Sequence, residues 1–255
     1  MIGRPTGRAS VALGLLAGSL VAGWSVPARA ADAGPAPTTA VDLELVLAVD
    51  VSGSVDPPEY ELQTRGLAQA FRDPEVQAAL QAPGRQGIAV SLVQWSGRFQ
   101  QAAAIDWTLV HDESSAEGFA RRIETMERRF QAETGIASAL AFALSHLQQD
   151  GFTGGRQVID ISGDGPSNVG GPPDAIRDAA AAARITINGL AIVNEVPDVD
   201  LYYASHVIGG PDAFLVVAKD YEDFARAIRR KLLREIESAP IAAREAPGPV
   251  LANGG

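Results

Sequence analysis

Short apolar runs alternate with longer amphipathic stretches along most of this chain, and this alternation constrains the fold more than any other feature. The apolar runs are predicted strands: Leu43–Val51, Gly87–Trp95, Ala102–Thr108, Gln157–Ser162, Thr186–Val193 and Ala213–Ala218. The amphipathic stretches are predicted helices: Glu59–Leu80, Ser115–Glu127, Gly135–Gln149, Pro173–Ala183, Val199–Ser205 and Tyr221–Glu237. Apolar strands separated by helices form a mostly parallel sheet with helices on both faces. The short link through Gly97 predicts that one edge strand is antiparallel.

The two ends of the chain differ in composition from the middle. Arg4 and Arg8 precede an apolar run of small residues, and Ala28–Arg29–Ala30 fits the cleavage pattern of a secretory signal peptide. A membrane anchor is the alternative, but several glycines interrupt the run. We therefore expect residues 1–30 to be a signal peptide, 31–40 a linker, 41–238 one domain and 239–255 a disordered tail. The mature protein is then periplasmic or secreted, with no stable membrane span.

Composition excludes several classes of function. The chain has no cysteine, which rules out disulfides, thiol nucleophiles, zinc–thiolate sites and iron–sulfur clusters. Its net charge of -10 argues against nucleic acid as a partner. The basic residues that do cluster, from Arg226 to Arg234, are interpreted as the solvated face of the last predicted helix.

Three oxygen-bearing side chains follow one another at the end of the first predicted strand. Asp50, Ser52 and Ser54 are spaced two apart, so in extended backbone they point the same way. Gly53 permits a tight turn there. Hard oxygen donors without thiolate or imidazole suit Mg²⁺, Ca²⁺ or Mn²⁺. Taken alone, the motif has a second interpretation, a turn whose side chains cap the following helix.

Two further segments favour the metal site over the capping turn. Asp164 follows the apolar strand Gln157–Ser162, and Thr134 stands at the start of the predicted helix 135–149. In open α/β sheets, ligands bind beyond the carboxyl ends of the strands, where the strand order reverses. Asp50 and Asp164 are both expected at that edge.

The order of these motifs resembles that of von Willebrand factor type A (vWA) domains. Asp-x-Ser-x-Ser, then Thr-x-Ile-x-x-Ala-Leu, then an apolar strand ending in Asp-Gly is the pattern of their metal-ion-dependent adhesion site (MIDAS), and the likeness runs from Val41 to Glu237. The segments Val158–Asn168 and Ile185–Leu190 are most similar to an exported bacterial subgroup, the DUF1194 type. The resemblance implies an α/β, three-layer Rossmann-like fold whose central sheet is mostly parallel with one antiparallel edge strand.

The same resemblance implies a site and a function. Ser52 and Ser54 would bind a divalent cation directly, Mg²⁺ before Ca²⁺ or Mn²⁺, and Thr134 would do so directly or through water. Asp50 and Asp164 would act mainly through bound water. The expected function is recognition of an Asp or Glu carboxylate on a protein or envelope-surface partner. No catalytic residue and no organic cofactor are expected.

Two positions depart from the family pattern. Gly163 stands where a Thr usually precedes the last motif aspartate, and Asp160 lies in a strand position that is normally apolar. We interpret Asp160 as a buried, hydrogen-bonded structural group in preference to an additional metal ligand. Two alternatives stay open: a metal-dependent hydrolase or phosphatase that uses the same oxygen cluster and, because of Gly163, a scaffold with a weak or vacant site.

Overall fold

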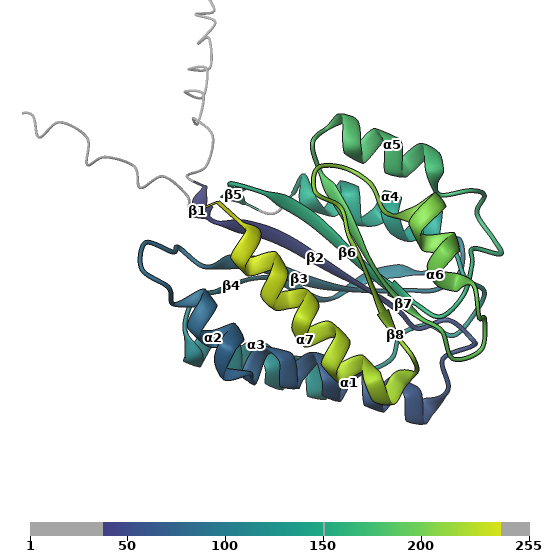
Figure 1. The fold of residues 1–255 in the computed structure, drawn as a ribbon, viewed down its shortest axis with the longest axis horizontal. Helices are drawn as coiled ribbons and strands as arrows, with labels where there is room; N and C mark the ends of the chain where they lie inside the picture. The colour runs from purple at the N-terminus through teal and green to yellow at the C-terminus, as the bar shows by residue number, and fades with distance from the viewer. Residues whose placement is uncertain (1–37, 150, 241–255) are drawn as a thin grey trace, which may run out of the picture. The chain divides into compact units, whose positions relative to one another are not determined.

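A six-stranded sheet forms the centre of the domain. The computed structural model describes residues 38–149 and 151–240. The strand order is β4-β3-β2-β6-β7-β8, and every neighbouring pair is parallel except the antiparallel edge pair β3–β4 (Figure 1). The strands are β2 (Leu43–Asp50), β3 (Ile88–Trp95), β4 (Gln101–Val110), β6 (Gln157–Gly163), β7 (Thr186–Ile192) and β8 (Leu215–Ala218). The predicted sheet, with its single antiparallel edge strand, is confirmed.

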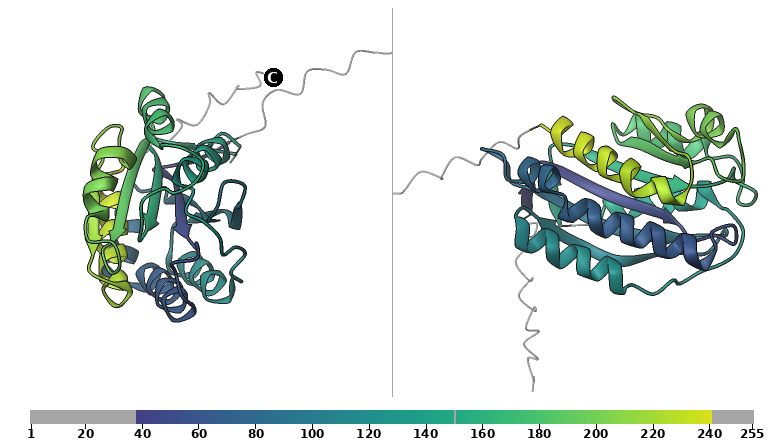
Figure 2. Two further views of the ribbon diagram at one scale, coloured as in Figure 1. Left: turned by 90° about the vertical axis from the view of Figure 1, so that its right-hand side faces the viewer. Right: turned by 60° about the horizontal axis from the view of Figure 1, so that its bottom comes forward.

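Helices cover both faces of this sheet, as predicted (Figures 1 and 2). One face packs against α1 (Pro57–Arg72), α2 (Pro74–Leu80), α3 (Glu113–Thr125) and α7 (Tyr221–Ser238). The other packs against α4 (Ile136–Leu147), α5 (Asp174–Ala182), α6 (Val199–Tyr202) and the π-helical turn η1 (Tyr203–Val207). None of the helices in the described ranges is long and apolar enough to cross a membrane.

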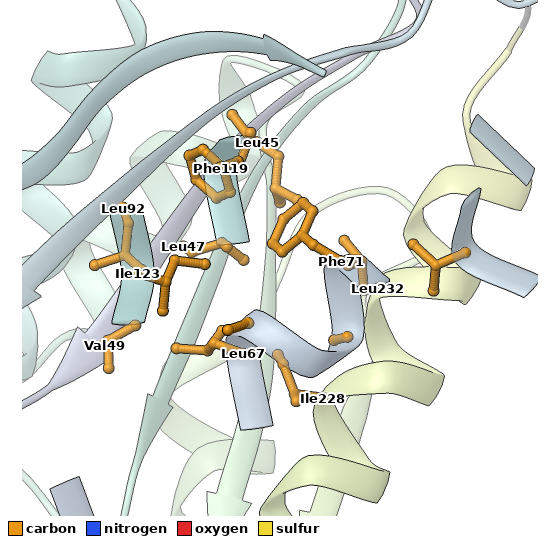
Figure 3. Packing of buried hydrophobic residues seen from close by; sticks show 14 of the residues in the cluster. Leu45, Leu47, Val49, Leu67, Phe71, Leu92, Phe119, Ile123, Ile228 and Leu232 are labelled. Atoms are coloured by element: carbon orange, nitrogen blue, oxygen red, sulfur yellow. The ribbon is translucent and has the colours of Figure 1, made fainter. Parts of the chain in front are cut away.

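The central strand β2 explains why its sequence is almost continuously apolar. Leu45, Leu47 and Val49 contact the core under α1, α3 and α7, whereas Val46 and Ala48 contact the core under α4 and α5. Successive side chains of a strand point to opposite faces, so a strand buried on both sides needs apolar residues at every position. Figure 3 shows Leu45, Leu47 and Val49 packed with Phe71 of α1, Phe119 of α3 and Leu232 of α7.

The structure corrects two predictions about element boundaries. The predicted helix Glu59–Leu80 is two helices, because Asp73 ends α1 and its carboxylate caps α2 ahead of Pro74. A second, two-stranded parallel sheet joins β1 (Thr39–Val41) to β5 (Phe152–Gly154). Thr39 and Ala40 therefore lie in a strand, and the predicted linker 31–40 is wrong for these two residues.

The two chain ends lie mostly outside the described residues. The predicted signal peptide, residues 31–37 of the linker and residues 241–255 of the tail are not described. Ala239, assigned to the predicted tail, is buried against the core, and its carbonyl accepts a 2.7 Å hydrogen bond from Arg85 Nη1. Its apolar methyl and this bond attach the chain just after α7.

A buried ionic cluster lies between β6, β7 and α7. Lys231 forms an ion pair with Asp160, and both residues are buried. Glu235, one turn further along α7, accepts hydrogen bonds from Asn188 (2.5 Å) and Arg156 (2.9 Å). Asp160 is thus a buried structural group, as predicted. The interpretation of the Arg226–Arg234 segment as solvated is wrong for Lys231, because the acid in the sheet draws its ammonium inward.

We expect Lys231→Met to destabilise the domain by about 3–5 kcal/mol, since it leaves the Asp160 carboxylate buried without its cation. Arg230→Met, an equivalent change at the adjacent exposed position, is the control and should change the free energy of unfolding little. Urea denaturation followed by circular dichroism measures both. Equal effects of the two substitutions would contradict a stabilising role for the buried pair.

Candidate metal centre

The predicted site residues meet where the strand order reverses. β2 and β6 are neighbours in the centre of the sheet, and the chain leaves β2 towards one edge and β6 towards the other. Asp50 is the last residue of β2, and Asp164 directly follows β6. Thr134 lies just before Gly135, the N-cap of α4. Because parallel strands end on the same side, the fold places all three at one edge.

Hydrogen bonds to its backbone groups hold the loop after β2 in shape. The Ser52 amide donates to Asp50 Oδ1 (2.7 Å), and the Gly53 amide donates to the Ala132 carbonyl (2.7 Å). Arg128 Nη2 donates to the carbonyls of Val51, Ser52 and Val55, at 2.7–2.9 Å. The loop is therefore fixed before any ligand binds, which lowers the entropic cost of assembling a site.

Three hydroxyl groups and two carboxylates, those of Asp50 and Asp164, form a cluster at this loop. Ser52 Oγ lies 3.2 Å from Ser54 Oγ and 3.4 Å from Thr134 Oγ1. Ser54 Oγ donates to Asp164 Oδ1 at 2.8 Å. Ser52, Thr134 and Asp164 are buried, whereas Ser54 is exposed and opens the cluster to solvent. The structure thus brings together the five residues that the sequence singled out.

The two carboxylates of the cluster are buried without an equivalent positive charge. Burial, followed by the nearby charge of Asp164, raises the pKa of Asp50 to about 8. Asp50 Oδ2 has no hydrogen-bond partner among the described residues. Arg128 is the cation whose charge acts on Asp50, but its guanidinium donates the hydrogen bonds described above to backbone carbonyls. A buried carboxylate in this state is stabilised by a cation, so the residues fit a divalent ion.

The donor set also restricts which ion fits. Within residues 38–149 and 151–240, no three His, Cys, Asp or Glu side chains converge in a metal-binding group. The cluster instead combines hydroxyls with only two carboxylates. Hydroxyl and carboxylate oxygens suit hard divalent cations such as Mg²⁺, Mn²⁺ and Ca²⁺.

Sequence reasoning missed several residues that support the cluster. Tyr221, the first residue of α7, donates from its hydroxyl to Asp164 Oδ2 at 3.1 Å. Asn168 Oδ1 accepts a hydrogen bond from the Thr134 backbone amide, and the Asn168 backbone amide donates to the Thr134 carbonyl, both at 2.9 Å. Gln63 Nε2 donates to the Asp50 carbonyl at 3.0 Å. An indication of Asn168 was present in the sequence, because it belongs to the segment that follows Asp164. Tyr221 and Gln63 have the sequence context of ordinary helix residues and gave none.

An exposed aromatic residue lies on a turn that is attached to the loop carrying Thr134. The turn between β3 and β4 carries Phe99, which is 87% exposed, with the Arg98 guanidinium 5.3 Å from its ring centre. This turn is attached to the loop that carries Thr134, because the Gly135 amide donates to the Ser96 carbonyl at 2.9 Å. The protruding phenyl ring on this turn offers an apolar contact surface.

The histidines have partners elsewhere. His146 Nε2 lies 2.8 Å from Ser91 Oγ, and its ring stacks on Trp107 with centres 5.2 Å apart. His206 Nδ1 lies 3.1 Å from Asp174 Oδ1. His111 lies beside Asp112, with Nε2 3.5 Å from Oδ2. These contacts give the three imidazoles structural or surface roles.

The architecture is that of a vWA-like domain, and the solved structures that share it include the following three. Proximal thread matrix protein 1 from the mussel byssus, in a structure described as having a zinc-occupied MIDAS motif, is 14% identical over 79% of this chain and 50% of its own (TM-score 0.56). The pilus adhesin SpaC from Lactobacillus rhamnosus GG is 13% identical over 76% and 30% (TM-score 0.56). A von Willebrand factor type A protein from Catenulispora acidiphila is 14% identical over 76% and 42% (TM-score 0.52).

At these identities the likeness concerns the fold, and the chain spans half or less of the length of each of these structures. A family model described as "Protein of unknown function (DUF1194)" matches residues 40–240. The chain belongs to the DUF1194 family, as its resemblance in sequence predicted. The comparison with curated proteins gives no match.

The raised pKa of Asp50 predicts how the metal-free protein responds to pH. Its folded pKa of about 8 exceeds the ordinary value of 3.8, so the folded state binds more protons than the unfolded state between these values. The contribution of Asp50 to stability therefore falls as pH rises from about 4 to 8. Asp50→Asn removes this contribution, and at pH 8 in EDTA we expect the variant to unfold at a higher temperature than the wild type.

Calorimetry at a series of pH values in EDTA measures this difference. The two unfolding temperatures should converge as the pH falls below the ordinary value of 3.8, where Asp50 is protonated in both states. Parallel pH profiles for wild type and Asp50→Asn would contradict the assignment of an uncompensated buried carboxylate.

Proposed function

We propose that the chain is an exported, non-enzymatic binding domain that recognises an acidic group through a divalent cation. Ser52, Ser54 and Thr134 would bind the ion, with Mg²⁺ as the preferred ion. Asp50 and Asp164 would act mainly through bound water. The partner would be a protein or an envelope surface that offers an Asp or Glu carboxylate. The observation that carries this proposal is the group of three hydroxyls against two buried carboxylates, open to solvent at Ser54.

The hydrogen bonds within the cluster support a role for the carboxylates behind the hydroxyls. Three of their four oxygens already accept bonds from the protein: from the Ser52 amide, the Ser54 hydroxyl and the Tyr221 hydroxyl. Neutral hydroxyls are then the groups free to face the ion. An ion held mainly by neutral ligands keeps most of its positive charge, and its remaining coordination positions attract a carboxylate from a partner.

The surroundings favour binding over catalysis. The three histidines, which are common general bases, make the contacts elsewhere that are described above. Phe99 is exposed on a turn that is attached to the Thr134 loop, and an exposed aromatic residue near a charged anchor is typical of a recognition surface. The neighbours of known structure include proteins named as an adhesin and as a matrix protein, which agrees with binding.

We expect Ser54→Ala to weaken Mg²⁺ binding by at least about tenfold, because even the loss of a residue behind the ligands costs that much at metal sites. Titration calorimetry with MgCl₂ measures the affinity. Ser145→Ala removes a serine hydroxyl from an exposed position of α4 and should leave the affinity unchanged. Absence of Mg²⁺ binding by the wild type, or equal affinities for all three proteins, would refute the site.

A pull-down from envelope extract tests recognition. We expect a partner that is retained with Mg²⁺, released by EDTA and not retained by Ser54→Ala. Phe99→Ala should weaken this retention without changing the Mg²⁺ affinity, because its ring lies outside the oxygen cluster. Retention that EDTA does not affect would contradict metal-dependent recognition.

A further inference from the structure

Two glycines interrupt buried strands beside the candidate metal centre. Gly163 is the last residue of β6, and Gly189 lies inside β7. Glycine weakens a strand interior and often marks a place where another group approaches closely. Both glycines are approached by the same side chain, that of Tyr203.

The side chain of Tyr203 lies across one face of the sheet, in the space that these glycines leave. A Cβ atom at Gly189 would stand 3.0 Å from Tyr203 Cδ1, and one at Gly163 would stand 2.6 Å from the Tyr203 hydroxyl. Real Cβ atoms very rarely approach other atoms as closely as the second distance, so Gly163 is required by the hydroxyl. The side chain is fully buried. Tyr203 is also the first residue of the π-helical turn η1, and this rare backbone form is frequent at functional sites.

The hydroxyl of Tyr203 ends next to Asp50. The same Cβ at Gly163 would stand 2.7 Å from Asp50 Oδ2, so the two oxygens lie close to one common point. Neither the hydroxyl nor Asp50 Oδ2 has a hydrogen-bond partner among the described residues. Two adjacent buried polar atoms without partners are costly, and a single water molecule between them can satisfy both.

We propose that Tyr203 is a positioning residue of the metal centre. Its hydroxyl shares a water molecule with Asp50 Oδ2 and so fixes the carboxylate whose other oxygen holds the Ser52 amide. Gly163 keeps the region next to both oxygens free of a side chain, and Tyr203 supplies from a distant element the hydroxyl that residue 163 lacks. This role rests on the proposed function, because it concerns the affinity of the same site for its ion.

Tyr203→Phe tests the role, since it keeps the ring and removes the hydroxyl alone. We expect its Mg²⁺ affinity, measured by titration calorimetry, to fall about tenfold to a hundredfold, as for other residues that orient metal ligands. Tyr202→Phe removes the hydroxyl of the adjacent tyrosine and should bind Mg²⁺ within about twofold of the wild type. An unchanged affinity of Tyr203→Phe would overturn the proposal, whereas a wild type that binds no Mg²⁺ would overturn the proposed function and this role with it.

A double-mutant cycle provides a readout that does not depend on the metal. Gly163→Ala places a methyl against the Tyr203 hydroxyl, so it should lower the unfolding temperature in EDTA. In the Tyr203→Phe background one of the two close contacts is gone, and the same substitution should cost clearly less. Additive effects would show that the two residues are not coupled and would contradict the assigned geometry.

Discussion

The burial of two carboxylates at the ends of neighbouring parallel strands is the constraint on which the rest of this site depends. The pairing of β2 with β6 brings Asp50 and Asp164 to one edge, where desolvation disfavours the charged form of Asp50 and raises its pKa. The surrounding residues stabilise the loop geometry rather than neutralise this charge: Arg128 bonds to carbonyls, and Tyr221 donates a neutral hydroxyl. The protein therefore presents a shaped group of oxygens whose charged form a cation stabilises, and a cation is the ligand that such a group selects.

Much of this arrangement was predictable because it follows from local patterns. Asp50, Ser52 and Ser54 share one side of a strand end, and Asp164 follows a strand that must be parallel to the first. Contacts between elements distant in sequence were not predictable. Lys231 appeared solvated because a helix pattern does not reveal that the facing strand carries Asp160. The strand Thr39–Val41 is too short for periodicity, and it forms only because Phe152–Gly154 pairs with it.

The places where the sequence breaks local rules are informative for the same reason. A lysine in a core, glycines inside buried strands and an acid in an apolar strand each reduce local stability. Each is matched in space: Lys231 by Asp160, and Gly163 and Gly189 by the ring and hydroxyl of Tyr203. The first match fastens α7 to the sheet. The second connects η1, which follows β7 along the chain, with Asp50 at the end of β2. A residue outside the two central strands β2 and β6 thus contributes to the site at their ends.

The pairing of β2 with β3 has a practical consequence for the study of this domain. Asp50 is the register partner of Trp95, and the Val51 amide donates to the Trp95 carbonyl at 2.9 Å. Adjacent strands lie about 4.8 Å apart, so a change of charge at Asp50 occurs one strand away from a buried indole in a rigid sheet. The wavelength of indole emission responds to the local electric field. Trp95 thus provides the domain with an internal optical reporter of events at the oxygen cluster, without the attachment of a dye.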